Sequence, residues 1–201
     1  MTLADEFGEI DIYLFDQLLR GRIRPGMRLL DAGCGGGRNL VYLLREGYEV
    51  YAADADSVAV DSVRRMASSL APGLPASNFV VAPVERMPFD NECADVVLSS
   101  AVLHFARDDR QFEAMIAEMW RVLKPGGMLW SRLASSIGLA DRIRSLAGRW
   151  SLLPDGSERY VVDEALLLDT TRRLGGQLFD PLKTTIVQGQ RAMTTWVVRK
   201  L

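Results

Sequence analysis

One stretch of the chain combines residue types that could hold a small charged ligand: the run Leu-Leu-Asp-Ala-Gly-Cys-Gly-Gly-Gly-Arg-Asn at positions 29–39. Its glycines permit backbone conformations that are closed to other residues, so a ligand can approach the main chain closely. Apolar residues before the turn predict a buried strand, and spaced leucines after it predict a helix. The N-terminus of such a helix favours an anionic group such as a carboxylate or phosphate.

The spacing of these residues distinguishes two kinds of nucleotide site. A dinucleotide fingerprint, G-x-G-x-x-G, aligned on Gly33 and Gly35 would place Arg38 where the third glycine belongs. This mismatch disfavours an NAD-dependent reductase, which stays as an alternative. Asp54 follows a second apolar strand about 20 residues after Gly33, where a carboxylate can accept hydrogen bonds from a ribose diol in either kind of site. Asp31, directly before the turn, is not part of the dinucleotide fingerprint and favours the other kind of nucleotide site.

Few residues could transfer protons or bind metals. The single histidine, His104, follows an apolar strand over 94–98, where a general base could reach a ligand and where a structural histidine is equally compatible. Tyr13 lies in an amphipathic N-terminal segment that could close over a ligand or contribute to the core. Cys34, Cys93 and the histidine show no ligand spacing, so we expect neither a disulfide nor a metal site.

Alternating strands and helices position these residues. Short apolar runs predict strands over 27–30, 49–53, 79–82, 94–98 and 128–133, and helical periodicity predicts helices over 5–20, 38–47, 57–70 and 109–123. Asp56 or Ser57 is suited to cap the helix over 57–70, and Asp163 is suited to cap a helix over 163–173. Strands over 178–187, interrupted at Pro181, and over 192–199 predict a terminal antiparallel hairpin. This order predicts an α/β fold whose parallel sheet has helices on both faces.

The composition is that of an ordinary soluble globular protein. The 201 residues suit one domain, with 48% hydrophobic and 25% charged residues. A formal net charge of −2 and the lack of a basic stripe disfavour nucleic-acid binding, and no apolar run suggests a membrane span. Acidic residues near the start do not resemble a secretory signal, so we expect a cytoplasmic protein, either a monomer or a homodimer.

The run Asp-Ala-Gly-Cys-Gly-Gly-Gly at 31–37 resembles motif I of the class I S-adenosylmethionine (SAM) dependent methyltransferases, which is close to D-x-G-C-G-x-G. The segments 84–90 and 99–105 and the turn at 124–127 are also similar to that family. The resemblance implies a Rossmann-like α/β fold, with a seven-stranded, mostly parallel sheet, helices on both faces and a C-terminal antiparallel hairpin. It also implies SAM as cofactor, S-adenosylhomocysteine as product, and no metal.

The resemblance implies roles for individual residues as well. The cofactor site would contain Asp31, Gly33, Gly35, Arg38, Asp54, Ala55, Val84, Glu85 and Ser99. Within it, Arg38 would pair with the methionyl carboxylate, or with a surface acid, and Asp54 would hold the ribose diol. His104 would act as general base and Tyr13 as part of a lid. Pro83 occupies the position where many relatives carry an acid for the adenine amino group.

The short sequences Gly-Arg-Asn at 37–39 and Leu-Ser-Ser-Ala-Val-Leu at 98–103 look like the bacterial tellurite-resistance group of small-molecule methyltransferases. Asp180, Pro181 and Lys183 occupy the stretch where that group carries basic and imidazole side chains, so tellurite is not the expected acceptor. Motifs of nucleic-acid methyltransferases are absent, which leaves a small-molecule acceptor. A non-catalytic SAM-binding regulatory or partner module is the alternative.

We expect one methyltransferase domain with four parts. Residues 1–26 would form an N-terminal helix and lid, 27–133 the SAM-binding core, 134–162 an acceptor cap, and 163–201 a helix and the terminal hairpin. The cap carries Arg142, Arg144 and Arg149, which could bind an anionic acceptor or form the polar face of a surface helix.

Overall fold

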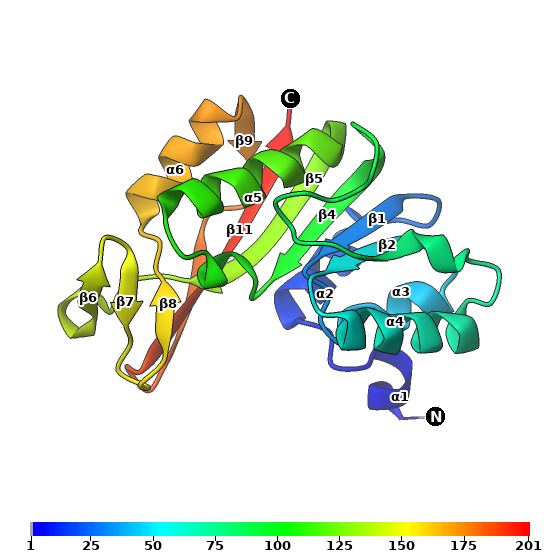
Figure 1. Ribbon diagram of the computed structural model, residues 1–201, viewed down its shortest axis with the longest axis horizontal. Helices are drawn as coiled ribbons and strands as arrows, with labels where there is room; N and C mark the ends of the chain where they lie inside the picture. Colours follow the sequence, from blue (N-terminus) through cyan, green and yellow to red (C-terminus); the bar gives the residue numbers. More distant parts are fainter. Residues whose placement is uncertain (1) are drawn as a thin grey trace.

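A sheet of eight strands forms the centre of the computed structural model, which describes residues 2–201 (Figure 1). Seven of these strands follow the order β3-β2-β1-β4-β5-β11-β10, and β9 pairs with β11. Their bounds are β1 Arg28–Ala32, β2 Glu49–Asp54, β3 Phe79–Val81, β4 Ala94–Ser100, β5 Leu123–Ala134, β9 Gly176–Leu178, β10 Lys183–Val187 and β11 Arg191–Lys200. The neighbours among β1–β5 are parallel, and β11 is antiparallel to β5, β9 and β10. The expected fold class is therefore confirmed.

Helices cover both faces of this sheet (Figure 1). They are α1 Leu3–Phe7, α2 Ile12–Leu19, α3 Val41–Arg45, α4 Ser57–Leu70, α5 Asp109–Val122 and α6 Glu164–Arg173, with 3₁₀ turns η1 Ala76–Asn78, η2 Leu103–Phe105 and η3 Ala140–Arg142. One buried cluster joins α2, α3 and α4 to the sheet, and a second joins α5 and α6 to it. None of the helices within residues 2–201 is long and apolar enough to cross a membrane.

The central strands β1 and β4 explain why both faces are covered. Leu29 and Val96 belong to the cluster with α2, α3 and α4, whereas their neighbours Leu30 and Val97 belong to the cluster with α5 and α6. Successive side chains of a strand point to opposite faces, so a strand that is buried on both sides must be apolar throughout. This is why the middle of each strand, residues 29–30 of β1 and 96–98 of β4, is apolar without alternation.

The helix caps predicted at Asp56 and Asp163 are present, and the structure adds a third at Asp108. The carboxylates of Asp56, Asp108 and Asp163 each accept a hydrogen bond from a backbone N–H two or three residues later, at the starts of α4, α5 and α6. Each cap satisfies one of the N–H groups that a helix leaves unpaired. These helices consequently begin where the sequence places them.

The N-terminal helix expected over 5–20 is wrong, because it is two helices. Gly8 has φ +63°, which ends α1, and Asp11 caps the new helix α2 by accepting from the N–H of Tyr13. The helix after the glycine turn also starts later than expected, at Val41. Residues 34–40 form turns instead, with N–H groups of residues 37 and 40 bonded to carbonyls three positions earlier.

Two irregular places in the sheet match the sequence analysis in part. The expected turn at 124–127 is a bulge within β5, where Gly126 has φ +78° and the pairing with β4 shifts register. The expected interruption at Pro181 is confirmed, because β9 and β10 pair with different parts of β11 on either side of it.

Between β5 and α6 the chain forms a separate antiparallel sheet of three short strands, β6 Arg144–Ala147, β7 Trp150–Leu152 and β8 Glu158–Tyr160 (Figure 1). A parallel bridge between Ser135 and Val162 joins the two ends of this insert. The strand β8 also contacts η2, which follows β4. The insert is thus placed next to the segment that leaves the end of β4.

The helix α2 is attached to the segment between β9 and β10 by a buried carboxylate. Asp180 is 6% exposed and accepts hydrogen bonds from Gln17 Nε2 at 3.0 Å and Arg22 Nη1 at 2.8 Å. The guanidinium of Arg20 adds a third, longer bond at 3.3 Å. Asp180 therefore serves the attachment of the N-terminal segment.

Candidate functional site

A cavity of about 510 Å³ lies at the carboxyl ends of β1, β2 and β4. Open α/β sheets bind ligands at this edge, and the volume is typical of small-molecule sites. The lining comes from the glycine loop, the ends of β2 and β3, and the segment from β4 to α5: Asp31, Gly33, Cys34, Gly35, Gly36, Arg38, Asn39, Asp54, Ala55, Pro83, Val84, Glu85, Ser100, Ala101, Val102, Phe105, Gln111 and Met115. Of the residues expected to bind a cofactor, all except Ser99 line this cavity.

Glycine is needed at two positions of the loop for different reasons. Gly33 has φ +83°, and a Cβ there would lie 2.5 Å from a methyl carbon of Val102. Gly35 has φ +49°, yet a Cβ there would meet no atom within 4 Å. Packing thus requires the first glycine, whereas the second exposes backbone to the cavity.

The loop is held by the end of β2. Backbone N–H groups of residues 33 and 34 donate to the carbonyl of Ala53 at 2.8 and 3.1 Å. The N–H of Gly35 donates to Asp54 Oδ2 at 2.8 Å, and Asp54 Oδ1 accepts from the backbone N–H two residues later at 2.9 Å. Asp54 therefore supports the glycine loop while it lines the cavity.

Asp31 has an unusual environment for a carboxylate. The residue is 2% exposed, and its Oδ1 has no hydrogen-bond partner among the residues that the structure describes. Burial, and secondarily the nearby Asp54 carboxylate, raise the pKa of Asp31 to about 7, with Arg38 acting in the opposite direction. A buried carboxylate with a free acceptor atom beside a cavity suits a cationic group such as an ammonium.

Arg38 contributes a guanidinium to the same cavity. Its Nη2 donates to Ser100 Oγ at 2.8 Å and lies 3.8 Å from Asp11 Oδ2. The Arg38 side chain is 45% exposed, whereas that of Asp11 is 4% exposed and also pairs with Arg132 at 3.0 Å. The sequence left open whether Arg38 meets a ligand or an acid of the protein, and the structure shows both the cavity and the acid within its reach.

The wall formed by the ends of β2 and β3 has a mixed character. Ala55 is exposed, Val84 is buried, and both line the cavity together with Pro83. Glu85 Oε1 accepts a hydrogen bond from Gln111 Nε2 at 2.9 Å. Two apolar side chains and a polar pair can therefore contact a flat heteroaromatic group here.

Two predicted site residues lie away from the cavity. Ser99 is completely buried within β4, and Ser100 takes its expected place because successive side chains of a strand alternate between faces. The hydroxyl of Tyr13 forms a 2.8 Å hydrogen bond with the hydroxyl of Thr185 on β10. Tyr13 is thus packed on the sheet edge and does not lie over the cavity.

His104 does not line the cavity either, and its surroundings do not favour the expected role of general base there. Its Nδ1 accepts a hydrogen bond from the N–H of Ala134 at 3.2 Å. Burial, followed by the charges of Arg159, Arg191 and Arg132, lowers the pKa of His104 to about 4. The imidazole is consequently neutral at pH 7, and the lone pair of Nδ1 is already engaged.

The segment after β4 supplies cavity residues that the sequence analysis did not single out: Ser100, Ala101, Val102, Phe105, Gln111 and Met115. Ala101 has φ +62°, an unusual backbone conformation for a residue with a Cβ. Phe105 is 55% exposed, and its place outside any apolar stripe was the available signal. Met115 reads as core from its helical spacing, and it belongs to both the core and the cavity wall.

The site and the fold agree with comparisons to known proteins. Residues 30–131, half of the chain, match the family described as "Methyltransferase domain", so the chain belongs to this family. An uncharacterized methyltransferase of Bacillus subtilis, YodH, is 35% identical over 105 residues, which cover 52% of this chain and 42% of YodH. A malonyl-[acyl-carrier protein] O-methyltransferase of Serratia marcescens is 32% identical over 142 residues, covering 70% of this chain and 49% of that protein.

A solved structure extends the likeness to nearly the whole fold. The 1,6-didemethyltoxoflavin-N1-methyltransferase of Burkholderia thailandensis, solved with its substrate and S-adenosylhomocysteine, has a TM-score of 0.72 at 20% identity. The match covers 98% of this chain and 80% of that one. The chain spans about half the length of the curated relatives it matches.

The cavity fits the cofactor that this family implies. Asp31 offers a buried acceptor atom without a partner for the ammonium of SAM, and Gly35 opens the backbone to the cavity. Asp54, Ala55 and Val84 offer a carboxylate and apolar contacts for a nucleoside. Within residues 2–201 no three potential metal ligands of the His, Cys, Asp and Glu types come together.

Proposed function

We propose that the chain transfers a methyl group from SAM to a small-molecule acceptor. The observation that carries this proposal is the buried Asp31 carboxylate, which has an unpartnered oxygen at a cavity formed by the glycine loop. No hydrogen-bond donor of the described chain pairs with that oxygen, and an ammonium would. The names of the compared proteins, which act on malonyl-acyl-carrier protein and on didemethyltoxoflavin, support a small acceptor.

The residues would divide the work as follows. Asp31 receives the ammonium, Arg38 the carboxylate, and Asp54 the ribose hydroxyls, while Ala55, Val84 and Glu85 contact the adenine. When bound, SAM would supply an electrophilic methyl group to a lone pair of the acceptor, with S-adenosylhomocysteine as the leaving product. The protein contributes mainly position, because well-oriented reactants can reach effective molarities of roughly 10⁵ M or more.

We assign the acceptor to the side of the cavity that the segment after β4 and the insert 134–162 share. The insert is the acceptor cap in this proposal, since β8 contacts η2 and Phe105 of η2 lines the cavity. The likeness to the tellurite-resistance group supports a small acceptor, although tellurite itself is not proposed. Asp180, which stands in the stretch where that group carries basic side chains, already holds α2.

Titration calorimetry with SAM and with S-adenosylhomocysteine tests the proposal. Asp54→Ala should weaken binding at least tenfold, since each hydrogen bond to a charged group contributes about 1.5 to 3 kcal/mol. Asp56→Ala is the matched control, because it removes the cap of α4 two residues away and should lower stability without a comparable loss of affinity. Wild-type protein that binds neither compound would refute the proposal.

Two further measurements separate the alternatives. If the protein is a non-catalytic SAM-binding module, it will bind SAM but form no S-adenosylhomocysteine when incubated with SAM and a mixture of candidate acceptors. An NAD-dependent reductase would give heat on titration with NADH, where we expect none. A methylated product together with S-adenosylhomocysteine supports the methyltransferase.

A further inference from the structure

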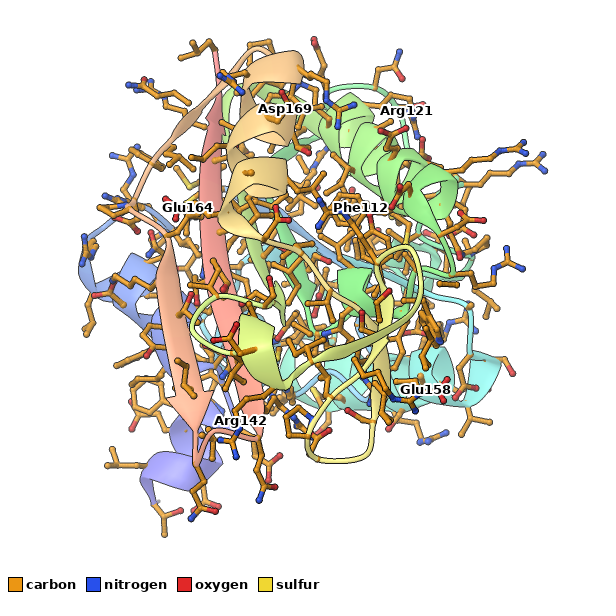
Figure 2. All side chains as sticks on the ribbon, turned by 90° about the vertical axis from the view of Figure 1, so that its left-hand side faces the viewer. Phe112, Arg121, Arg142, Glu158, Glu164 and Asp169 are labelled. Atoms are coloured by element: carbon orange, nitrogen blue, oxygen red, sulfur yellow. The ribbon has the colours of Figure 1, made fainter. Side chains whose placement is uncertain are left out.

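The strand β8 of the insert packs against the helix α5. Tyr160 of β8 is 1% exposed, and its hydroxyl donates to Asp109 Oδ1 at 2.7 Å. Its ring stacks on Phe112 of α5, labelled in Figure 2, with the centroids 5.0 Å apart. The residue before it, Arg159, is therefore held in a defined position next to η2.

Arg159 lies over an aromatic side chain of the cavity wall. Its Cζ is 4.8 Å from the centroid of the Phe105 ring, within the range of a cation–π contact. Phe105 lines the cavity and is 55% exposed although it is a large apolar side chain. An exposed aromatic ring beneath a guanidinium at a cavity wall can bind a flat group that carries negative charge.

The charge of Arg159 is not neutralised within the described part of the chain. Its Nη1 donates to the backbone carbonyl of Glu158, and no carboxylate of residues 2–201 forms an ion pair with it. Two nearby arginines differ in this respect, because Arg132 pairs with Asp11 at 3.0 Å and Arg191 with Asp155 at 2.6 Å. Burial and, secondarily, the charges of these three guanidiniums lower the pKa of His104, with Arg159 the largest of the three charges.

The arginines that the sequence suggested for an anion have other positions. Arg149 pairs with the helix-capping Asp163 at 2.9 Å. Arg142 lies on η3 beside Gly189 of the hairpin turn, and Figure 2 shows it away from Glu158 on β8. Arg144 is exposed on β6. Of the arginines in the insert, Arg159 is the one in contact with a residue of the cavity wall.

The cavity wall next to Arg159 is neutral. The residues contributed by β4, η2 and α5 are Ser100, Ala101, Val102, Phe105, Gln111 and Met115, none of which is ionised at pH 7. An acceptor on this side would have an apolar or aromatic body. A negative charge on such an acceptor could be met at the edge, where Arg159 contacts Phe105.

We infer that Arg159 and Phe105 bind the methyl acceptor, and that the acceptor is an apolar or aromatic molecule carrying a carboxylate. The inference rests on the proposed function and adds the class of substrate. The guanidinium offers two parallel N–H donors to the carboxylate, and the Phe105 ring contacts the apolar body. Both side chains are specificity-determining residues for the acceptor and have no part in cofactor binding.

Binding measurements without turnover test this inference. The probes are benzoate, cinnamate and naphthoate, each paired with its neutral primary amide, and their affinities are measured by ligand-observed NMR and calorimetry in the presence of saturating S-adenosylhomocysteine. We expect the wild type to prefer the acid of at least one pair by about tenfold, as for a charge-assisted hydrogen bond. Arg159→Gln should abolish that preference, and Arg159→Lys should retain part of it.

Arg144→Gln is the matched control, since it removes an exposed guanidinium from the same small sheet and should leave the preference unchanged. Equal binding of acid and amide, binding of no acid at all, or a preference that survives in Arg159→Gln would overturn the inference. A loss of S-adenosylhomocysteine affinity in folded Arg159→Gln would overturn it too, by moving Arg159 to the cofactor side. Failure of the wild type to bind S-adenosylhomocysteine would instead refute the proposed function.

Discussion

Replacing Asp31 by Asn should stabilise the free protein above neutral pH. Asp31 is buried and its pKa is raised from 3.8 to about 7, so the folded state holds the proton more tightly than the unfolded state. Such a group costs stability as pH rises from about 4 towards 7, and the cost is constant above pH 7. A rise of about 3 pH units at 1.36 kcal/mol each corresponds to a cost of about 4 kcal/mol.

Urea unfolding followed by circular dichroism measures this effect. The stability difference between Asp31→Asn and wild type should grow by about 2 to 3 kcal/mol between pH 5 and pH 8, the part of the titration that lies in that interval. The same variant should bind S-adenosylhomocysteine more weakly, because a neutral amide cannot pair with the ammonium. The substitution should therefore raise the free energy of unfolding and lower the affinity for S-adenosylhomocysteine.

Asp95→Asn is a control of opposite sign. Burial raises the pKa of Asp95, but hydrogen bonds from Lys124 and the backbone of Arg28 outweigh it and lower the pKa overall. Asp95→Asn should therefore lose stability at pH 8 relative to wild type. If Asp31→Asn were no more stable than wild type at pH 8, or if its difference from wild type did not change with pH, the account of Asp31 would be refuted.

Four other substitutions give distinct outcomes. Gly33→Ala should unfold at lower urea concentration, by about 1 to 3 kcal/mol, with partial recovery when Val102 is also truncated to Ala, whereas Gly35→Val should lose SAM affinity more than stability. Asp180→Ala should lower the free energy of unfolding by about 3 kcal/mol, because it leaves the buried Gln17 of α2 and the guanidinium of Arg22 without their acceptor. His104→Asn should leave the pH dependence of kcat unchanged near neutrality; loss of an acidic limb of the profile would show that His104 acts as a general base after all.

The sequence predicted those parts of the fold whose structure depends on neighbours along the chain. Parallel strands buried on both faces are continuous apolar runs, and aspartates cap the helices that follow them, so β1, β2, α4 and α5 appear where expected. The hairpin β10–β11 is a local feature as well, and so is the break at Pro181 that separates β9 from β10. The positions of most cavity-lining residues could be predicted as well, because these residues lie at the ends of these strands.

The errors concern contacts between residues that are distant in sequence. Whether His104 faces a ligand depends on the N–H of Ala134, and whether Tyr13 covers a cavity depends on Thr185 at the other end of the chain. The secondary structure of the insert could not be predicted, because its strands contain only three or four residues and every residue of β6 is exposed. Without a buried face there is no alternation to detect, so Arg159 could not be placed near Phe105.

Arg38 shows how the N-terminal segment can be coupled to the proposed cofactor site. The pair Arg38–Asp11 joins a half-exposed guanidinium to a carboxylate at 3.8 Å, a type of ion pair that contributes little. Asp11 keeps its closer partner, Arg132 at 3.0 Å, and its backbone N–H keeps its bond to Asn39 Oδ1. Arg38 can therefore turn to a ligand carboxylate without leaving a buried charge unpaired, because Arg132 continues to compensate Asp11. Without Arg132, Arg38 would be the remaining partner of the Asp11 carboxylate and would stay paired with it. Arg132, which does not line the cavity, would thus determine how readily Arg38 binds a ligand carboxylate.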